Sequence, residues 1–250
     1  MKRFFYRAKQ ISRLYRDCHI GAYSAQAAFF VVVSVVPLAM LFVMVAGVLL
    51  SSQDVGGVLS QVFSGQAIRQ VAGLLAQAGQ YTTFPLVSVT TIFLVWSATR
   101  GVRSIAQGIN VIYSGKVSQL RLAAGAVLYT VVLLAGAAVT AVVTAKVILH
   151  GAVVFVFAVV MCTFAYTIFS PKRYGFVSQL AGGVLSAAGC TVFTAGYMVY
   201  VRHFSAYPVI YGGFGAVVLW LLWLYICSCI VLCGALVNRL IQDKGQRNAG

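Results

Sequence analysis

Side chains that could carry acid-base or metal chemistry are scarce in this sequence. There is no Glu, and the remaining acids and imidazoles are three Asp and three His, at Asp17, Asp54, Asp243, His19, His150 and His203. General acid-base and metal-assisted catalysis need such groups to converge on one point. A metal site from Asp54, His150 and His203 is the alternative, but no ligand spacing supports it. We therefore expect a protein that is not an enzyme, with no catalytic residue, cofactor or metal.

The six cysteines are the other candidates for reactive groups. Cys229 and Cys233 share one face of a helix, close to Cys227. They fall in an apolar stretch, where a thiolate is costly and Cys usually behaves as a small hydrophobic residue. Metal binding there is the alternative to simple packing. The spacing of the cysteines does not indicate a secreted disulfide framework.

Two groups of residues could instead bind an anion. In the first, Arg100, Arg103 and Asn110 recur at helical spacing, beside an apolar stripe within residues 100–113. This pattern predicts an amphipathic helix at the membrane interface, whose arginines meet lipid phosphates. The alternative is that these side chains face an inner cavity and bind an anionic group there.

The second group lies in residues 207–215, where Tyr211, Gly212 and Gly213 follow Pro208. Pro and several Gly predict a broken start to the next helix, whose free amides could face an anion or a solute. An ordinary interfacial turn, with its tyrosines in the aromatic belt, explains the same residues. Both interpretations stay open from the sequence.

The elements that must position these residues are predicted by composition. Of the 250 residues, 61% are hydrophobic and 8% charged, far from the averages of soluble proteins. A helix crosses a bilayer with roughly 20 mostly apolar residues, while it satisfies its own backbone hydrogen bonds. The predicted spans are residues 27–50, 81–99, 122–149, 151–169, 180–201 and 214–237. We expect an all-α polytopic membrane protein of about six helices.

The whole chain, residues 1–250, then forms a single membrane domain, with tails at 1–26 and 238–250. The third and fourth spans almost merge near Lys146 and Gly151, and a single helix of that length would overshoot any bilayer. A tight helical hairpin is therefore expected there.

The net charge of +15 has a one-sided distribution. With six spans, all of the 18 Lys and Arg residues except Arg69, Lys146 and Arg202 fall on one side. This asymmetry is the positive-inside signal and predicts that both termini are cytoplasmic. The expected partners are membrane lipids, with anionic headgroups at the cytoplasmic face, and not nucleic acid; an oligomer is compatible with the sequence.

Two connecting segments have amphipathic patterns. Residues 51–80 predict two short helices that either cap the bundle or lie on the membrane. Residues 100–113 predict another after the second span. Amphipathic helices are thus expected between spans one and two and between spans two and three.

Small residues and one proline predict how the spans pack. Gly182, Gly189 and Gly196 recur every seven residues in the fifth span, which favours close helix packing over a flexible cavity lining. Pro37 predicts a kink in the first span, and the Ser34 hydroxyl could satisfy a carbonyl freed there.

Several motifs together resemble the YihY/BrkB family, also labelled ribonuclease BN-like. They are Ala25-Gln26-Ala27-Ala28-Phe29-Phe30 with Ser34 and Pro37, Trp96-Ser97 with Arg100-Gly101-Val102-Arg103, Asn110 to Tyr113, Tyr211-Gly212-Gly213-Phe214-Gly215-Ala216, Leu222-Trp223-Leu224-Tyr225, and Gly234-Ala235. The resemblance covers nearly the whole chain and implies a bacterial inner-membrane protein of six helices without a settled activity. Family members commonly carry Glu after the last Gly-Ala, where this chain has Leu236.

Three functions follow as hypotheses. The first is translocation of a small solute or lipid-like molecule through the bundle. The second is a membrane protein that organises lipid or a partner complex without transport. The third and most remote is a membrane-associated ribonuclease, for which the sequence offers no cluster of acids and histidines.

Overall fold

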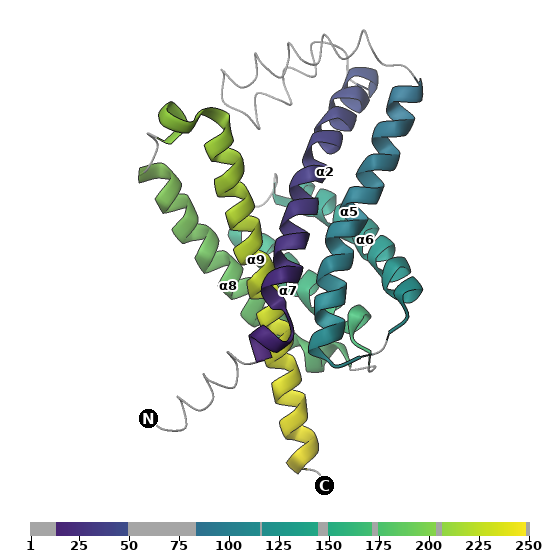
Figure 1. Cartoon of the computed structure of the whole chain (residues 1–250), viewed down its shortest axis with the longest axis vertical. Coiled ribbons are helices and arrows are strands. Elements are labelled where there is room, and N and C mark those ends of the chain that lie inside the picture. The colour runs from purple at the N-terminus through teal and green to yellow at the C-terminus, as the bar shows by residue number, and fades with distance from the viewer. Residues whose placement is uncertain are drawn as a thin grey trace. The chain divides into compact units, whose positions relative to one another are not determined.

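The computed structural model describes residues 14–49, 84–115, 117–144, 150–171, 175–203 and 207–248. This part of the chain contains long α-helices and no strand (Figure 1). The helices are α2 (Ile20–Leu49), α5 (Phe84–Ile112), α6 (Gln119–Thr144), α7 (His150–Phe169), α8 (Phe176–His203) and α9 (Tyr207–Asn248). The all-α prediction is confirmed for the described residues.

Four of these helices are long and apolar enough to cross a membrane. The qualifying stretches are Gln119–Ala137, Gly151–Phe169, Phe176–Val201 and Val217–Asp243. A shorter apolar stretch, Ile20–Val35, lies in α2. Because only the described residues enter this comparison, six crossings stay a prediction.

Helix α5 joins two elements that the sequence analysis separated. The predicted second span and the amphipathic helix after it form one continuous helix, Phe84–Ile112. Gly101 lies at the junction, and a single Gly costs only about 1 kcal/mol in a helix interior. Gly101 and its neighbour Ser104 are both buried, and this packing keeps the helix continuous despite that cost.

The expected broken start of the last span is wrong. Helix α9 begins at Tyr207 and runs without interruption through Gly212 and Gly213 to Asn248. Pro208 stands in the first turn, where its missing N–H has no helical partner to lose. Tyr211 therefore lies on a regular helix. The C-terminal end of α9 extends beyond α7 and α8 (Figure 1).

Pro37 lies inside α2, which continues as one helix on both sides of it. In a regular helix, Pro37 would leave the Val33 carbonyl without its donor. The Ser34 hydroxyl does not reach that carbonyl; it donates to the Val31 carbonyl at 2.7 Å. The proposed rescue of the freed carbonyl is therefore wrong for Val33.

Residues 51–80 and the turn at Lys146 lie outside the described residues, and so do the predicted amphipathic pair and hairpin. α6 and α7 are separate helices that pack against each other, as the hairpin requires.

The chain divides into two compact units. One consists of residues 30–98, and the other of residues 1–29 and 99–250. In the first unit, the Trp96 ring meets Phe30 edge-on at 5.8 Å and lies 5.6 Å from Phe93, centroid to centroid. The Phe30–Trp96 contact therefore packs α2 against the middle of α5 within residues 30–98.

In the second unit, α6 packs on α7, α7 on α8, and α8 on α9. Its buried hydrophobic core draws on α6, α7, α9 and the end of α5, and includes Ile109, Ile112, Tyr166, Leu232 and Leu236. Leu236, which stands where the resembled family commonly has Glu, is fully buried in this core. A carboxylate at this position would be enclosed by apolar side chains.

The end of α5 is fixed by a Schellman motif. The Gly115 amide donates to the Asn110 carbonyl at 2.9 Å and the Ser114 amide to the Val111 carbonyl at 2.9 Å. Ser114 has a φ of 53°, the left-handed conformation that this motif requires. The motif turns the chain towards α6 and brings Gly115 against Pro171 after α7.

Candidate functional site

Helices α8 and α9 approach each other at the level of their backbones. A Cβ added to Gly182 would lie 2.4 Å from the Gly234 carbonyl oxygen, and one added to Gly234 would lie 2.8 Å from the Gly182 oxygen. Only glycine at both positions permits this approach, because any side chain would overlap the facing backbone. The contact defines the register of the two helices.

Asn238 uses this approach to bind the backbone of α8. Its Oδ1 accepts the Gly182 N–H at 2.7 Å, and its Nδ2 donates to the Gln179 carbonyl at 2.9 Å. Asn238 is fully buried. One amide side chain thus satisfies both of its ends on one turn of the neighbouring helix.

Gln179 extends the polar contacts to α5. The Tyr113 hydroxyl donates to Gln179 Oε1 at 2.8 Å. Gln179 is 0% exposed, and its Nε2 has no hydrogen-bond partner among the described residues. The side chain therefore keeps an unused donor inside the protein.

Tyr166 adds α7 to the same region. Its hydroxyl donates to the Val231 carbonyl at 2.6 Å and lies 2.7 Å from Ser186 Oγ. We call Tyr113, Tyr166, Gln179, Ser186 and Asn238 the polar core. All five side chains are buried, and they come from α7, α8, α9 and the end of α5.

Other buried polar atoms beside these elements have no partner in the described structure. They are Asn110 Oδ1, Ser170 Oγ and both side-chain polar atoms of Gln242. An unpaired buried polar group costs about 1–3 kcal/mol, and buried water commonly provides the missing bonds. The polar core region thus has hydrogen-bonding capacity that the described residues do not fill.

Arg239 lies one residue after Asn238 and caps the C-terminal end of α5. Its Nη1 donates to the Ile112 carbonyl, and its Nε lies 3.6 Å from Asp243 Oδ2. A cation at a helix C-terminus is favoured by the helix dipole. Arg239 therefore fixes α5 against α9 beside the polar core.

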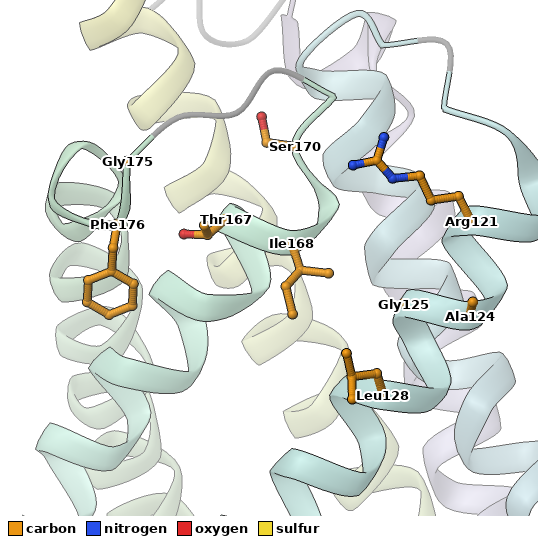
Figure 2. Close-up of a pocket in the computed structure, with 9 residues that line it drawn as sticks. All are labelled: Arg121, Ala124, Gly125, Leu128, Thr167, Ile168, Ser170, Gly175 and Phe176. Atoms are coloured by element: carbon orange, nitrogen blue, oxygen red, sulfur yellow. The ribbon is translucent and has the colours of Figure 1, made fainter.

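A pocket of about 680 Å³ opens between the first turns of α6 and α8 and the last turn of α7. We call it the Arg121 pocket; it is lined by Arg121, Ala124, Gly125, Leu128, Thr167, Ile168, Ser170, Gly175 and Phe176. Figure 2 shows Arg121 extending from α6 towards the side where Ser170 lies, with Leu128 farther along α6. One end of the pocket is therefore cationic and the other apolar.

The predicted anion-binding group on α5 is spread over different surroundings. Arg100 is exposed, and Arg103 is half-buried with its Nη2 donating to Gln119 Oε1 at 3.0 Å. Asn110 is buried beside Gly115. None of the three lines the Arg121 pocket. A shared cavity for Arg100, Arg103 and Asn110 stays a prediction.

The predicted packing glycines of α8 differ along the helix. Gly182 meets the α9 backbone, and a Cβ at Gly189 would lie 2.8 Å from Ile230 Cγ2. A Cβ at Gly196 would meet no atom within 4 Å, so the expected contact at that position is absent from the described structure. Gly183, which the pattern omitted, lies against Thr163 of α7.

Gln179, Asn238 and Arg121 are site residues that the sequence patterns do not predict. Gln179 and Asn238 each fall one residue outside a predicted span, Gln179 in a connecting segment and Asn238 in the C-terminal tail. Their signal was spacing, because Gln179, Gly182 and Ser186 recur on one face of a helix. From the sequence, Arg121 contributes only to the one-sided charge that predicts the topology.

Metal-ligating residues do not gather in the part of the chain that the structure describes: no group of three His, Cys, Asp or Glu comes together there. Cys190 Sγ instead approaches the Cys227 carbonyl at 3.8 Å, across the α8 and α9 interface. All six cysteines are free thiols in the structure.

Comparison with known proteins places these features in a family context. The family model described as Virulence factor BrkB matches residues 11–250. The ribonuclease-like protein YfkH of Bacillus subtilis is 24% identical over 246 residues, covering 88% of this chain and 90% of YfkH.

Shorter matches join the chain to UPF0761 membrane proteins. That of Nitrosospira multiformis is 33% identical over 73 residues, and that of Paraburkholderia xenovorans is 36% identical over 75 residues. These matches cover 29% and 30% of this chain, but only 17% of each relative. No solved structure matches the chain significantly.

Proposed function

As this chain belongs to the virulence factor BrkB family of membrane proteins, we propose that it translocates a small solute or lipid-like molecule through its helical bundle. The observation that supports this function is the polar core, a set of buried hydrogen-bonding side chains among helices otherwise apolar enough to cross a membrane. Polar groups inside membrane proteins are costly and commonly mark pathways for substrates.

Unpaired buried polar atoms also support translocation, because a polar molecule that passes could bind to them. Gln179 Nε2 and Asn110 Oδ1 are a buried donor and a buried acceptor without partners among the described residues. Water or the polar group of a passing molecule would regain the free energy that these atoms lose by burial. A purely structural network would gain more by satisfying every atom.

Flux through purified protein in liposomes tests the proposal. Two probes cover both substrate classes: a fluorescent phospholipid quenched from outside, and entrapped carboxyfluorescein. We expect the wild type to accelerate one of them over protein-free liposomes, and Gln179→Leu to reduce this flux. Thr194→Ala is the matched control, because Thr194 accepts the Trp223 indole N–H at 3.2 Å across the same two helices.

The proposal fails if the wild type moves neither probe faster than protein-free liposomes do. It also fails if folded Gln179→Leu protein carries the same flux as Thr194→Ala.

A second candidate is organisation of lipid without transport, which the Arg121 pocket favours, because its cationic and apolar ends suit an amphiphile. Lipid binding in the absence of any flux would select this function.

We further propose a bacterial inner-membrane location with both termini in the cytoplasm, supported by the one-sided Lys and Arg distribution. Labelling of terminal cysteine tags from one side of the membrane tests that orientation.

A further inference from the structure

The Arg121 pocket differs from the polar core because it opens at the surface and carries a net positive charge. Arg121 is the charged residue among the nine that line it, and none of them is acidic. In the described part of the chain, Arg121 makes no ion pair. We propose that this pocket binds an anionic phospholipid, with the phosphate at Arg121 and an acyl chain along Leu128 and Phe176.

The cationic end suits a phosphate. Arg121 is the third residue of α6, and the N-terminal end of α8 lies across the pocket at Gly175 and Phe176. Arginine binds phosphate through its planar fork of donors, and the positive end of a helix dipole favours an anion. The Arg121 charge and the α8 dipole therefore both favour a negative group in the pocket.

Ser170 adds a second polar group to the wall. It is 4% exposed, and its Oγ has no partner among the described residues. Thr167 also lines the pocket, but its hydroxyl already donates to the Thr163 carbonyl at 2.8 Å. Ser170 is therefore the lining residue whose hydroxyl, itself buried, has no partner among the described residues, and rotation of its side chain would present it to a phosphate.

The apolar end indicates a lipid and not a free anion. Leu128 lies seven residues after Arg121, about 10 Å farther along the helix axis. Ile168 and Phe176 contribute apolar side chains from the other two helices. A free phosphate would leave this surface unused, whereas an acyl chain would cover it.

The helix faces around the pocket are also apolar. Leu120 and Leu128 on α6 and Val177 on α8 are 82%, 56% and 81% exposed, respectively, on helices long enough to cross a membrane. Large apolar side chains in such positions meet lipid tails. The pocket is thus continuous with surfaces that acyl chains cover, and its occupant can enter from the bilayer.

This inference does not depend on translocation. A lipid held at the Arg121 pocket can be a fixed structural lipid, and the polar core of α5, α7, α8 and α9 is a separate set of side chains.

Native mass spectrometry of the full chain in detergent tests the proposal, with phosphatidylglycerol and phosphatidylcholine of equal chain length added as probes. The variants are Arg121→Gln, which removes the charge, and Ala124→Trp, which fills the pocket from an exposed position. Arg16→Gln is the matched control, because Arg16 is also an exposed arginine and does not line the pocket.

We expect phosphatidylglycerol to bind the wild type and the Arg16→Gln control more tightly than phosphatidylcholine does. Arg121→Gln should weaken phosphatidylglycerol binding about fivefold, the loss expected for one interfacial cation. Ala124→Trp should weaken both lipids, because it blocks the shared acyl-chain site.

Three results would overturn the proposal. The first is equal phosphatidylglycerol binding by Arg121→Gln and Arg16→Gln. The second is equal binding of the two lipids by the wild type. The third is complete displacement of phosphatidylglycerol by an equal concentration of inorganic phosphate, which would assign the pocket to a free anion.

Discussion

The backbone N–H of Gly182 in α8 donates a hydrogen bond to Asn238 Oδ1 in α9 over 2.7 Å. A side chain can reach this amide because residue 182 has no side chain of its own and α9 lies close to it. The lack of a side chain also lets the Gly234 carbonyl approach so closely that its oxygen would lie 2.4 Å from a Cβ added at residue 182. Gly182 therefore contributes to both the close approach and the polar contact between the two helices.

Replacing Asn238 should destabilise the pair. Asn238→Leu keeps the branched shape of the side chain but removes two buried hydrogen bonds, and we expect a loss of about 1–3 kcal/mol. Thermal unfolding in detergent, followed by tryptophan fluorescence, measures it. Asn238→Asp is the control, because it keeps the acceptor for the Gly182 amide but loses the donor to Gln179. An unchanged melting temperature in Asn238→Leu would contradict the structural role of this side chain.

Alanine at three glycines of α8 should give a graded result. Gly182→Ala places a methyl group against the α9 backbone, and overpacking of this kind costs about 1–3 kcal/mol. Gly196→Ala meets open space and should be neutral or slightly stabilising, since Ala favours a helix over Gly by about 1 kcal/mol. Gly189→Ala should lie between them, because the atom that must move belongs to the Ile230 side chain. Equal melting temperatures for Gly182→Ala and Gly196→Ala would exclude the backbone contact.

Ser114→Gly should stabilise the end of α5. Ser114 holds a left-handed φ of 53°, which costs an L-residue about 1–2 kcal/mol and glycine almost nothing. Part of that gain is lost to the greater freedom of glycine in the unfolded chain, so we expect a net gain below about 1 kcal/mol. Ser114→Ala keeps the backbone strain and is the matched control. A melting temperature of Ser114→Gly at or below that of Ser114→Ala would show that the strain is absent.

Alkylation of Cys18 should be slow and should need high pH. Cys18 precedes α2 and is buried, and this burial raises the pKa of its thiol, while the nearby Arg239 charge lowers it by less. Because the folded-state pKa lies above that of an unfolded thiol, the thiolate stays scarce at pH values where an ordinary cysteine reacts.

The sign of the linked stability follows from the same shift. Folding is favoured by the neutral thiol below its ordinary pKa, and this contribution disappears as the pH rises through the folded-state pKa. Peptide-resolved mass spectrometry after iodoacetamide treatment measures the rate. Labelling of Cys18 in the folded protein as fast as in dodecyl sulfate at pH 8 would contradict the prediction.

Purified protein should not cleave RNA in the presence of Mg²⁺. The whole chain has three Asp and no Glu, and two-metal nucleases hold their ions with clustered carboxylates. Gel analysis of a labelled RNA, with an Asp243→Asn variant beside the wild type, measures the activity. Cleavage that copurifies with the wild type and disappears in Asp243→Asn would reverse the proposal that this chain is not an enzyme.

The positions of the long helices follow from local signals. An apolar stretch such as Gly151–Phe169 has the length that a bilayer demands, and the sequence placed this element correctly to within one residue of α7. Helix ends follow less directly from local signals, because Pro208 predicts a break but is tolerated in a first turn. α5 and α9 are therefore longer than their predicted spans.

The amino-acid sequence by itself determined that the described residues form apolar α-helices, since hydrophobic length is a property of each segment alone. The tertiary structure decided which faces meet. Gln179 contacts Tyr113 across 66 residues, and Asn238 contacts Gly182 across 56. Helical periodicity gives every helix a similar set of faces, so the partners depend on which backbones can come close enough. That choice rests on Gly182 and Gly234 together, and neither glycine alone reveals the other.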